Sequence, residues 1–418
     1  MKQVTAVLIG AGDRGTNAFG PFALNNPGTI QFVAVVDRDE EKRRHFQRVH
    51  GIPDERAFDH WDDLFARGKI ADAILICTNE KYHYEPTKQA MAQGYHILLE
   101  KPITQEPETC VEIGDLAARY DKVFMLGYVL RYTPFFSEMK RRLEAGAIGQ
   151  IRTILLSENT GMAHFSHSYV RGIFGMEAIA GPMILSKCCH DMDILNWLTD
   201  SRCVRLSSFA SDTFFKAENA PPGVPKRCTD GCPISDTCYY YAPKMYSAPR
   251  SGFNVEMISV DQTPEGRMKA LEHGPFGRCV YHCENNAVDT QVINMLYANG
   301  VTVSFSMTAY SDVCYRMIKI SGTEGEIAGN LEKNEFTIKD FASGRHETVG
   351  VSTVLDRHSG GDYFIMSDFV KHVRDDVKGG RTDAAKAVDS HVMCFAAEKS
   401  RKESTEIDLE QYKQELRR

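Results

Sequence analysis

The chain has 418 residues, of which 43% are hydrophobic and 25% are charged. This length predicts two or three domains and a core large enough to fold without disulfides or a structural metal. The 49 Lys and Arg against 56 Asp and Glu give a net charge of −7, which, with no long basic run, excludes nucleic acid and an anionic membrane as the main partner.

The chain begins MKQVTAVLIGAG and runs directly into a structural motif, without the pattern of a signal peptide. No apolar window approaches the roughly 18 residues that a membrane-spanning helix needs. The twelve cysteines are compatible with a compartment in which thiols stay reduced. We therefore expect a soluble cytoplasmic protein with no membrane partner.

Residues 1–128 alternate short apolar runs with polar segments of helical length. Runs rich in Val, Ile and Leu are typical of buried parallel strands. They are Val4–Ile9, Phe32–Val36, Ala71–Cys77, His96–Leu99 and Val123–Leu126. Helices are expected between them at about 14–25, 39–50, 83–93 and 107–120. This α/β alternation predicts an N-terminal Rossmann domain, a doubly wound parallel sheet.

Gly10, Gly12 and Gly15 form a G-x-G-x-x-G motif between the first predicted strand and the first predicted helix. The first glycine permits a tight turn, the second lets the backbone approach a pyrophosphate, and the third lets helix and strand pack closely. The phosphates then lie at a helix N-terminus, where free amides favour negative charge. Together with Asp13 and Arg14 of the same loop, these residues are assigned to a dinucleotide cofactor.

Asp37 ends the second predicted strand, 22 residues after Gly15. An acid at this place accepts hydrogen bonds from the ribose hydroxyls of adenosine. Its charge would repel a 2′-phosphate and so favours NAD, whereas Arg38 directly after it leaves NADP as an alternative cofactor.

Beyond Ile148-Gly149-Gln150 the pattern changes to strands that follow one another through turns. Expected strands are Ile151–Glu158, two within Val288–Ala309 joined by an Asn-Gly hairpin signal, Met317–Ile320 and the β pattern of Phe336–Val349. Expected helices are Met183–Leu198, Asp362–Arg374 and Thr382–Lys402. Residues 129–418 are therefore predicted to form an α/β domain with an open, mostly antiparallel sheet. An irregular insert rich in Cys and Pro interrupts it at about 212–285.

Further motifs follow in a fixed order: Cys77-Thr78-Asn79, His83, Glu100-Lys101-Pro102, Gly127-Tyr128-Val129-Leu130-Arg131-Tyr132-Thr133-Pro134, Gly146-Ala147-Ile148-Gly149, Gly322-Thr323-Glu324-Gly325 and His358-Ser359-Gly360-Gly361-Asp362. In this order the chain resembles the Gfo/Idh/MocA oxidoreductases, the family of glucose–fructose oxidoreductase and inositol dehydrogenase, over nearly its whole length. The resemblance implies a sugar, polyol or cyclitol substrate held between the domains against the nicotinamide. It also implies a homodimer or homotetramer formed through the C-terminal sheet.

By position, the resemblance assigns further residues to the cofactor: Thr78, Asn79, His83, Glu100, Lys101 and Arg131. Lys101 also matches the active-site lysine of the family, whose ammonium would hold the reacting hydroxyl at the carboxyl end of a parallel strand. His190 matches the second catalytic residue, which would accept the hydroxyl proton. The family usually has Asp four residues before this histidine; Ser186 stands there and adds no charge.

The segment 164–172 brings His, Tyr and Arg together on one loop, a combination that can bind several hydroxyls at once. Family members place substrate-binding residues in this region. The residues assigned to the substrate are Tyr128, His167, Tyr169, Arg171 and Asp191. The alternative interpretation of the segment is a loop at a subunit contact.

Cys228, Cys232 and Cys238 lie close together in the insert. C-x3-C-x5-C is not a standard zinc spacing, although a fourth thiol from Cys203, Cys279 or Cys283 could complete a tetrahedral zinc site or hold an iron–sulfur cluster. Free thiols are the other interpretation, and no metal is assigned.

Three functions are compatible with these motifs. The first is an NAD(P)-dependent dehydrogenase that acts on CH–OH groups of a sugar or polyol. The second is an NAD-dependent glycoside hydrolase that oxidises the sugar transiently, eliminates the aglycone, adds water and reduces the product again. The third is a nucleotide-binding regulator without catalysis, against which the retention of Lys101 and His190 argues. Net formation of NADH separates the first two.

Overall fold

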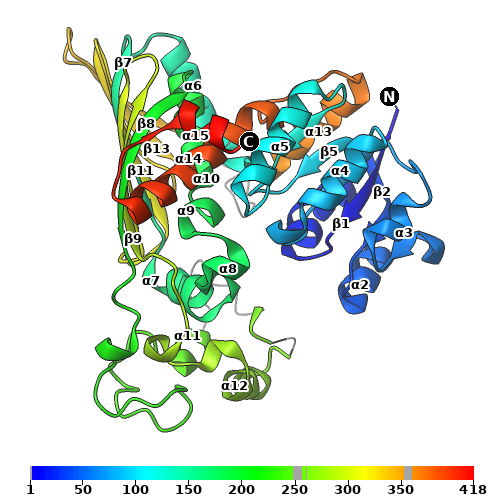
Figure 1. Ribbon diagram of the computed structural model, residues 1–418, viewed down its shortest axis with the longest axis vertical. Coiled ribbons are helices and arrows are strands. Elements are labelled where there is room, and N and C mark those ends of the chain that lie inside the picture. The colour runs from blue at the N-terminus through cyan, green and yellow to red at the C-terminus, as the bar shows by residue number, and fades with distance from the viewer. Residues whose placement is uncertain (1, 248–256, 260, 353–359) are drawn as a thin grey trace.

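The computed structural model describes residues 2–247, 257–259, 261–352 and 360–418. Part of the predicted insert and the His358-Ser359 end of one motif lie outside the described residues. Figure 1 shows the N-terminal half, in blue and cyan, beside a large sheet from the C-terminal half that is seen edge-on.

The N-terminal half forms a six-stranded parallel sheet in the order β3-β2-β1-β4-β5-β6. Its strands are β1 (Val4–Ile9), β2 (Ile30–Val36), β3 (Ala57–Phe58), β4 (Ala73–Ile76), β5 (His96–Leu99) and β6 (Phe124–Leu126). The helical segments are η1 (Arg14–Phe19), α1 (Gly20–Asn25), α2 (Glu40–His50), α3 (Trp61–Phe65), α4 (Tyr84–Ala92) and α5 (Pro107–Arg119). The predicted doubly wound sheet is confirmed. The short β3 and α3 were not predicted, because segments of two and five residues carry no measurable periodicity.

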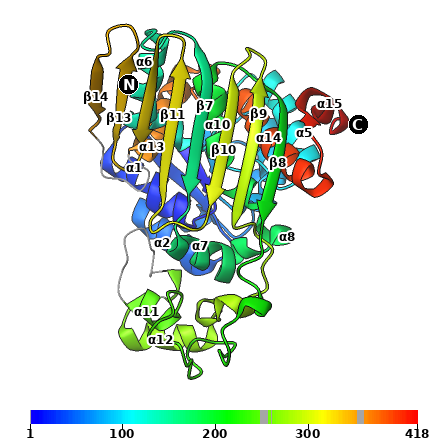
Figure 2. The ribbon, with the colours of Figure 1, turned by 90° about the vertical axis from the view of Figure 1, so that its left-hand side faces the viewer.

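The C-terminal half forms a nine-stranded sheet in the order β14-β13-β12-β11-β7-β10-β9-β8-β15. Its strands are β7 (Ile151–Asn159), β8 (Cys203–Ser211), β9 (Thr290–Tyr297), β10 (Thr302–Thr308), β11 (Tyr315–Gly322), β12 (Gly325–Asn330), β13 (Glu335–Asp340), β14 (His346–Gly350) and β15 (Ile407–Asp408). Neighbouring strands are antiparallel except β7 and β10, so the predicted open, mostly antiparallel sheet is confirmed. Figure 2 shows one broad face of this sheet toward the viewer, with the helices behind it.

The longer helices of the C-terminal half are α6 (Pro134–Glu144), α10 (Cys189–Thr199), α13 (Gly361–Asp375), α14 (Ala384–Glu403) and α15 (Leu409–Glu415). Short helical segments are η4 (Val129–Tyr132), α7 (Met162–Phe165), η5 (Ser166–Arg171), α8 (Glu177–Ala180) and α9 (Met183–Ser186). No helix in the described ranges is both long and apolar enough to cross a lipid bilayer.

The prediction of one continuous helix over Met183–Leu198 is wrong. The helix is interrupted at Lys187 and Cys188, and α10 begins only at Cys189. The apolar periodicity continues across the break because both parts bury side chains in the same core. At the interruption the chain contacts another element: the Lys187 ammonium lies 3.4 Å from the carboxylate of Glu158 on β7.

Helix α13 belongs to the C-terminal half of the sequence but packs on the N-terminal sheet. Its residues Ile365, Phe369 and Val370 share one apolar core with Ala6 and Leu8 of β1. Figure 1 shows this orange helix beside the blue and cyan elements. The N-terminal sheet is therefore covered on one face by a helix that is encoded more than 200 residues later.

In the part of the insert that the structure describes there are two α-helices, α11 (Ala242–Ser247) and α12 (Pro264–His273), which lie below the sheet in Figures 1 and 2. They enclose a small apolar core of their own, formed by Cys228, Ala242, Met245, Tyr246 and Leu271. The prediction of an irregular insert holds for its loops but missed these two helices.

Candidate active site

The glycine-rich turn between β1 and η1 leaves its backbone open on one side. Gly10 has a φ of +94°, and a Cβ there would lie 2.6 Å from the carbonyl carbon of Cys77. A Cβ on Gly15 would lie 2.4 Å from the Gly10 carbonyl oxygen, whereas a Cβ on Gly12 would meet no atom within 4 Å. Close packing therefore requires Gly10 and Gly15, and Gly12 leaves space for a phosphate to approach the backbone.

A cavity of about 250 Å³ lies beside this turn, at the carboxyl ends of β1, β2 and β4. Ligands of open parallel sheets bind at this kind of position, where the strand order reverses. Predicted cofactor residues that line the cavity are Gly10, Gly12, Asp37, Arg38, Thr78 and Asn79. Trp61, the first residue of α3, and Tyr82, in a short helical turn, also line it. Sequence reasoning missed both, since a single aromatic residue in so short a segment has no periodicity to mark it.

Asp37 is oriented by two backbone amides. The N–H of Ala11 donates to its Oδ2 at 2.7 Å, and the N–H of Asp39 donates to its Oδ1 at 2.9 Å. The carboxylate is thereby fixed next to the glycine turn, with lone pairs left for ribose hydroxyls.

The guanidinium of Arg38 lies over two aromatic rings, 5.6 Å from the ring centres of both Trp61 and Tyr82. Its Nη2 is 3.1 Å from Nε2 of His60. A flat cationic and aromatic group beside Asp37 fits the adenine end of a dinucleotide.

The loop after β4 offers a polar atom to the same cavity. The Thr78 hydroxyl is buried and has no hydrogen-bond partner among the described residues. Buried polar groups are almost always satisfied, so this hydroxyl fits a polar group of a bound cofactor. His83 holds the loop in place, with Nε2 3.0 Å from the Thr78 carbonyl and Nδ1 2.8 Å from the Pro102 carbonyl. Asn79 caps the following turn by accepting from the N–H of Lys81.

Arg14 is held between two acids from distant parts of the chain. Its Nε donates to Glu100 at 2.7 Å, and its Nη2 donates to Asp362 of α13 at 2.8 Å. Burial opposes the charged guanidinium, but the two carboxylates outweigh burial and raise the pKa of Arg14. Its neighbour Asp13 accepts a hydrogen bond from Asn17 at 2.8 Å on the exposed side of the turn. The cofactor roles assigned to Asp13, Arg14 and Glu100 stay predictions.

Lys101 comes from the N-terminal half and reaches the segment α9–α10, which contains His190. The Lys101 ammonium donates to the Ser186 carbonyl at 2.8 Å. This carbonyl belongs to the last residue of α9, and a helix end leaves carbonyls without intrahelical partners. The break after Ser186 thus creates the acceptor that Lys101 uses. His190, 8% exposed, lies in the first turn of the next helix.

Tyr128 lies beneath the imidazole of His190. The two rings pack edge-to-face with centres 5.6 Å apart. The Tyr128 hydroxyl is fully buried, 2.8 Å from the Ser390 hydroxyl and 2.9 Å from His391 Nδ1 on α14. Burial raises the pKa of Tyr128 well above its ordinary value. Ser390 and His391 were not singled out from the sequence, because they lie in the apolar pattern of a long helix.

Two aspartates of α10 are each held by an arginine. Asp191 accepts from Nε of Arg316 at 2.7 Å and from its Nη2 at 3.2 Å. Asp193 accepts from Nε of Arg131 at 2.7 Å and from its Nη2 at 2.6 Å. Both aspartates are buried, and burial raises the pKa of each while its arginine opposes the shift. The substrate role assigned to Asp191 and the cofactor role assigned to Arg131 are untested, and both side chains are committed to these pairs.

The predicted substrate loop forms the π-helical turn η5, and two of its polar side chains face the insert. Arg171 is 1% exposed and donates to the carbonyls of Arg278 at 2.7 Å and Tyr240 at 2.6 Å. His167 Nδ1 lies 3.0 Å from the Tyr246 hydroxyl.

Tyr169 lies on the other side of η5 and stacks on Phe165 at 5.4 Å between ring centres. Burial raises its pKa, and the neighbouring Lys187 and Ser186 partly oppose this. Of the predicted loop residues, Tyr169 is therefore the one beside α9, and the roles assigned to His167 and Arg171 stay predictions.

The five cysteines of the insert are free thiols. Within the described ranges, no three His, Cys, Asp or Glu side chains come together in an arrangement that could hold a metal ion.

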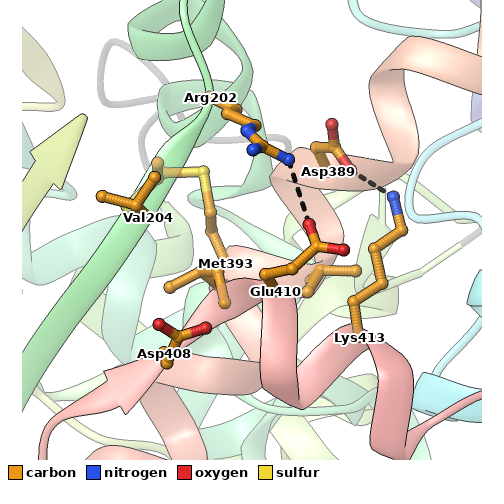
Figure 3. Close-up of a pocket in the computed structure, with 10 residues that line it drawn as sticks. Arg202, Val204, Asp389, Met393, Asp408, Glu410 and Lys413 are labelled. Atoms are coloured by element: carbon orange, nitrogen blue, oxygen red, sulfur yellow. Dashed lines mark hydrogen bonds and ion pairs between the residues drawn. The ribbon is translucent and has the colours of Figure 1, made fainter. Parts of the chain in front are cut away.

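A separate cavity of about 160 Å³ lies where β8, α14 and α15 meet (Figure 3). Two ion pairs border it: Arg202 with Glu410 at 3.0 Å, and Lys413 with Asp389 at 2.6 Å. None of its lining residues belongs to the candidate active site. The remaining carboxylate of the lining, Asp408, accepts a hydrogen bond from the N–H of Gln411 at 2.9 Å. The charged groups of this cavity thus have partners of their own, and the cofactor cavity and the Lys101 region remain the candidate site.

Two family models match the chain. Residues 4–128 match an oxidoreductase family described as an NAD-binding Rossmann fold, and residues 140–409 match the C-terminal alpha/beta domain of the same family. The first match confirms the predicted NAD-binding domain.

Individual relatives are distant. YteT of Bacillus subtilis, named as an oxidoreductase, is 20% identical over 358 residues, which span 81% of each chain. Inositol 2-dehydrogenase of Corynebacterium glutamicum is 24% identical over 205 residues, which span 49% of this chain and only 56% of that enzyme. Among solved structures, levoglucosan dehydrogenase in complex with NADH and levoglucosan has a TM-score of 0.72 at 18% identity, over 97% of this chain and 99% of that one. At this identity the structure supports the fold alone.

Proposed function

Since the chain belongs to the Gfo/Idh/MocA family of NAD(P)-dependent oxidoreductases, we propose that it is a dehydrogenase acting on a secondary hydroxyl of a sugar, polyol or cyclitol. The observation that carries the proposal is the meeting of Lys101 with the α9–α10 segment that contains His190. A base and a cation beside the dinucleotide crevice are the groups that oxidation of an alcohol needs.

In this mechanism Lys101 holds the substrate hydroxyl. Its ammonium has three N–H donors, of which one is engaged with the Ser186 carbonyl, so two remain for a hydroxyl oxygen. The positive charge stabilises the oxygen as it becomes an alkoxide. His190 takes the hydroxyl proton on its imidazole, which in neutral form is a suitable acceptor near pH 7.

The residues of the 250 Å³ cavity fit the dinucleotide. Asp37 would hold the adenosine ribose, Gly12 would face the pyrophosphate, and Thr78 would bind a polar group further along the cofactor. When bound, NAD supplies the hydride acceptor. Arg38 would lie against the adenine, and the Asp37 carboxylate favours NAD over NADP.

The test is absorbance at the nicotinamide band with purified protein, NAD or NADP, and a panel of myo-inositol, D-glucose, D-galactose, levoglucosan and nitrophenyl glycosides. NADH that accumulates with a polyol or sugar supports the dehydrogenase. Release of nitrophenol without net NADH contradicts it and supports the NAD-dependent glycosidase. Tight NAD binding without any turnover on the panel contradicts both.

We propose further that the chain forms a homodimer or homotetramer through the open face of the nine-stranded sheet (Figure 2). The described helices lie on the other face of the sheet, and β7 and β11 accordingly alternate between more buried and more exposed residues. Exposed apolar side chains on these and neighbouring strands support an interface here; they are Leu155, Phe209, Val292 and Met317. Exposed apolar surface of this kind marks association sites.

A further inference from the structure

Helix α10, which contains His190, is bound by two arginines from different elements. Arg131 lies in η4, directly after the last strand of the N-terminal sheet, and Arg316 lies on β11 of the C-terminal sheet. Each arginine binds both oxygens of its aspartate through Nε and Nη2, at 2.6–3.2 Å. Paired parallel bonds of this type fix direction as well as distance.

The two pairs contact different sides of the helix. At 3.6 residues per turn, Asp191 and Asp193 project about 160° apart, and His190 lies within the arc between them. A rotation of α10 about its axis would break one pair or the other. The direction of the Cα–Cβ bond of His190 therefore depends on the same two contacts.

Both arginines are themselves anchored. Arg316 also lies 3.0 Å from the fully buried carboxylate of Glu158. Arg131 donates to the Arg381 carbonyl at 3.0 Å, and Arg381 donates back to the Arg131 carbonyl at 2.7 Å. Each arginine is therefore also bound to groups outside α10.

Net stability is a weak explanation for these pairs, because desolvation of buried charges cancels most of their attraction. The alternative is that the pairs orient α10, and the sequence just before this helix supports that role. Ser186, before the break, adds no charge that could orient His190. We propose that Asp191 and Asp193 are positioning residues. Through their pairs with Arg316 and Arg131 they fix the rotation of α10 about its axis, and they direct the His190 side chain toward the point where the Lys101 ammonium contacts the α9–α10 segment. This role rests on the proposed dehydrogenase function.

The test uses Asp191→Asn, Asp193→Asn and Arg316→Lys. Each keeps the size or the charge of the side chain but weakens one of the two bidentate Arg–Asp pairs. Asp115→Asn is the matched control, because it weakens an exposed bidentate pair with Arg417, at 2.9 and 2.7 Å, far from α10 in sequence. The first measurement is the rate at which diethyl pyrocarbonate modifies His190, followed by peptide mass mapping. Exposed His45 is the internal reference. This readout needs no substrate.

In the three variants of the Arg–Asp pairs we expect the modification rate of His190 to change at least threefold and that of His45 to stay the same. In Asp115→Asn both rates should equal those of the wild-type protein. On a substrate from the panel above, we expect kcat to fall at least tenfold, KM for NAD to stay within twofold, and the solvent deuterium isotope effect on kcat to rise. A smaller folded fraction would lower kcat without changing the isotope effect. If one Asn variant fails to fold, Arg316→Lys, which retains the charge, carries the test.

Wild-type His190 reactivity in all folded variants would overturn the proposal, and so would wild-type kcat with an unchanged isotope effect. Failure of the whole panel with wild-type protein would contradict the proposed function instead. The modification rates would then still report whether the two Arg–Asp pairs orient His190.

Discussion

The Lys101 ammonium spans the boundary between the two halves of the molecule by reaching Ser186. Lys101→Ala removes this cation from the proposed site, so we expect turnover to fall below a tenth of the wild-type rate. A loss of that size corresponds to more than about 1.4 kcal/mol of transition-state stabilisation. NAD affinity should stay within a few-fold, because Lys101 does not line the cofactor cavity. Steady-state rates and fluorescence titration with NAD measure the two effects, and a variant that keeps more than a tenth of the rate removes Lys101 from the mechanism.

Asp37 governs a separate property, the choice between NAD and NADP. Its carboxylate is fixed by the N–H groups of Ala11 and Asp39, and Arg38 lies next to it. Asp37→Ser removes the charge that would repel a 2′-phosphate and leaves Arg38 to attract it. We expect the ratio of kcat/KM for NAD to that for NADP to fall at least tenfold, or about 1.4 kcal/mol. An unchanged ratio would mean that Asp37 does not face the ribose.

At the level of single residues, sequence reasoning worked where a motif encodes a local backbone geometry. Gly10 was predicted from its spacing, and the structure gives it a positive φ and a tight contact with Cys77. Arg171 is different. Its acceptors are carbonyls of residues 69 and 107 positions later in the chain. Nothing in the segment 164–172 marks those partners, so a structural arginine and a sugar-binding arginine have the same local sequence.

At the level of elements, His167 connects η5 to the insert through its contacts with Tyr246 and Phe276. Burial lowers the pKa of His167 to about 4, against about 6.5 in an unfolded chain. The unfolded state therefore takes up a proton at a higher pH than the folded state does. The resulting stabilisation is full above about pH 6.5 and is lost as pH falls toward 4, at up to about 1.4 kcal/mol per pH unit.

His167→Phe should remove this pH dependence and keep the ring that stacks on Phe276 at 4.5 Å. We expect a somewhat lower Tm at pH 7.5, since the bond to Tyr246 is lost, but a smaller drop in Tm between pH 7 and pH 5 than in the wild-type protein. Differential scanning calorimetry across this range measures both. Parallel Tm curves for the two proteins would contradict the assignment. His45→Phe, at an exposed position, is the control.

Element boundaries were predicted best where one periodicity runs from end to end. Helix α13 was expected at Asp362–Arg374 and is found at Gly361–Asp375. The segment from Met183 shows the limit of this reasoning, because its apolar period continues through Lys187 although the helix does not. An ion pair with Glu158 of β7 lies at that break, and a partner 29 positions away leaves no trace in the local pattern.

At the level of the whole molecule, the open sheet face carries the prediction on assembly. Val292 and Met317 are 46% and 52% exposed on neighbouring parts of that face. The double variant Val292→Lys, Met317→Lys should place two charges in the proposed interface and shift the protein to a monomer of 46.9 kDa. Light scattering after size-exclusion chromatography measures the mass. Phe341→Lys, equally exposed but in the turn after β13, should leave the mass unchanged. A wild-type monomer, or an oligomeric double variant, contradicts the interface.

The position of α13 has a consequence for how the protein is made. The strands of the N-terminal sheet are complete when residue 126 has been synthesised, but the helix that covers Ala6 and Leu8 ends at residue 375. At roughly 5–20 residues per second, a ribosome needs on the order of 10–50 s to reach it. During that time the nascent Rossmann half exposes the part of this apolar core that α13 later covers, although residues of η1, α1 and α2 already pack on it. This protein therefore reaches its final N-terminal core after translation is nearly finished, and a chaperone that shields the nascent chain would act on this face.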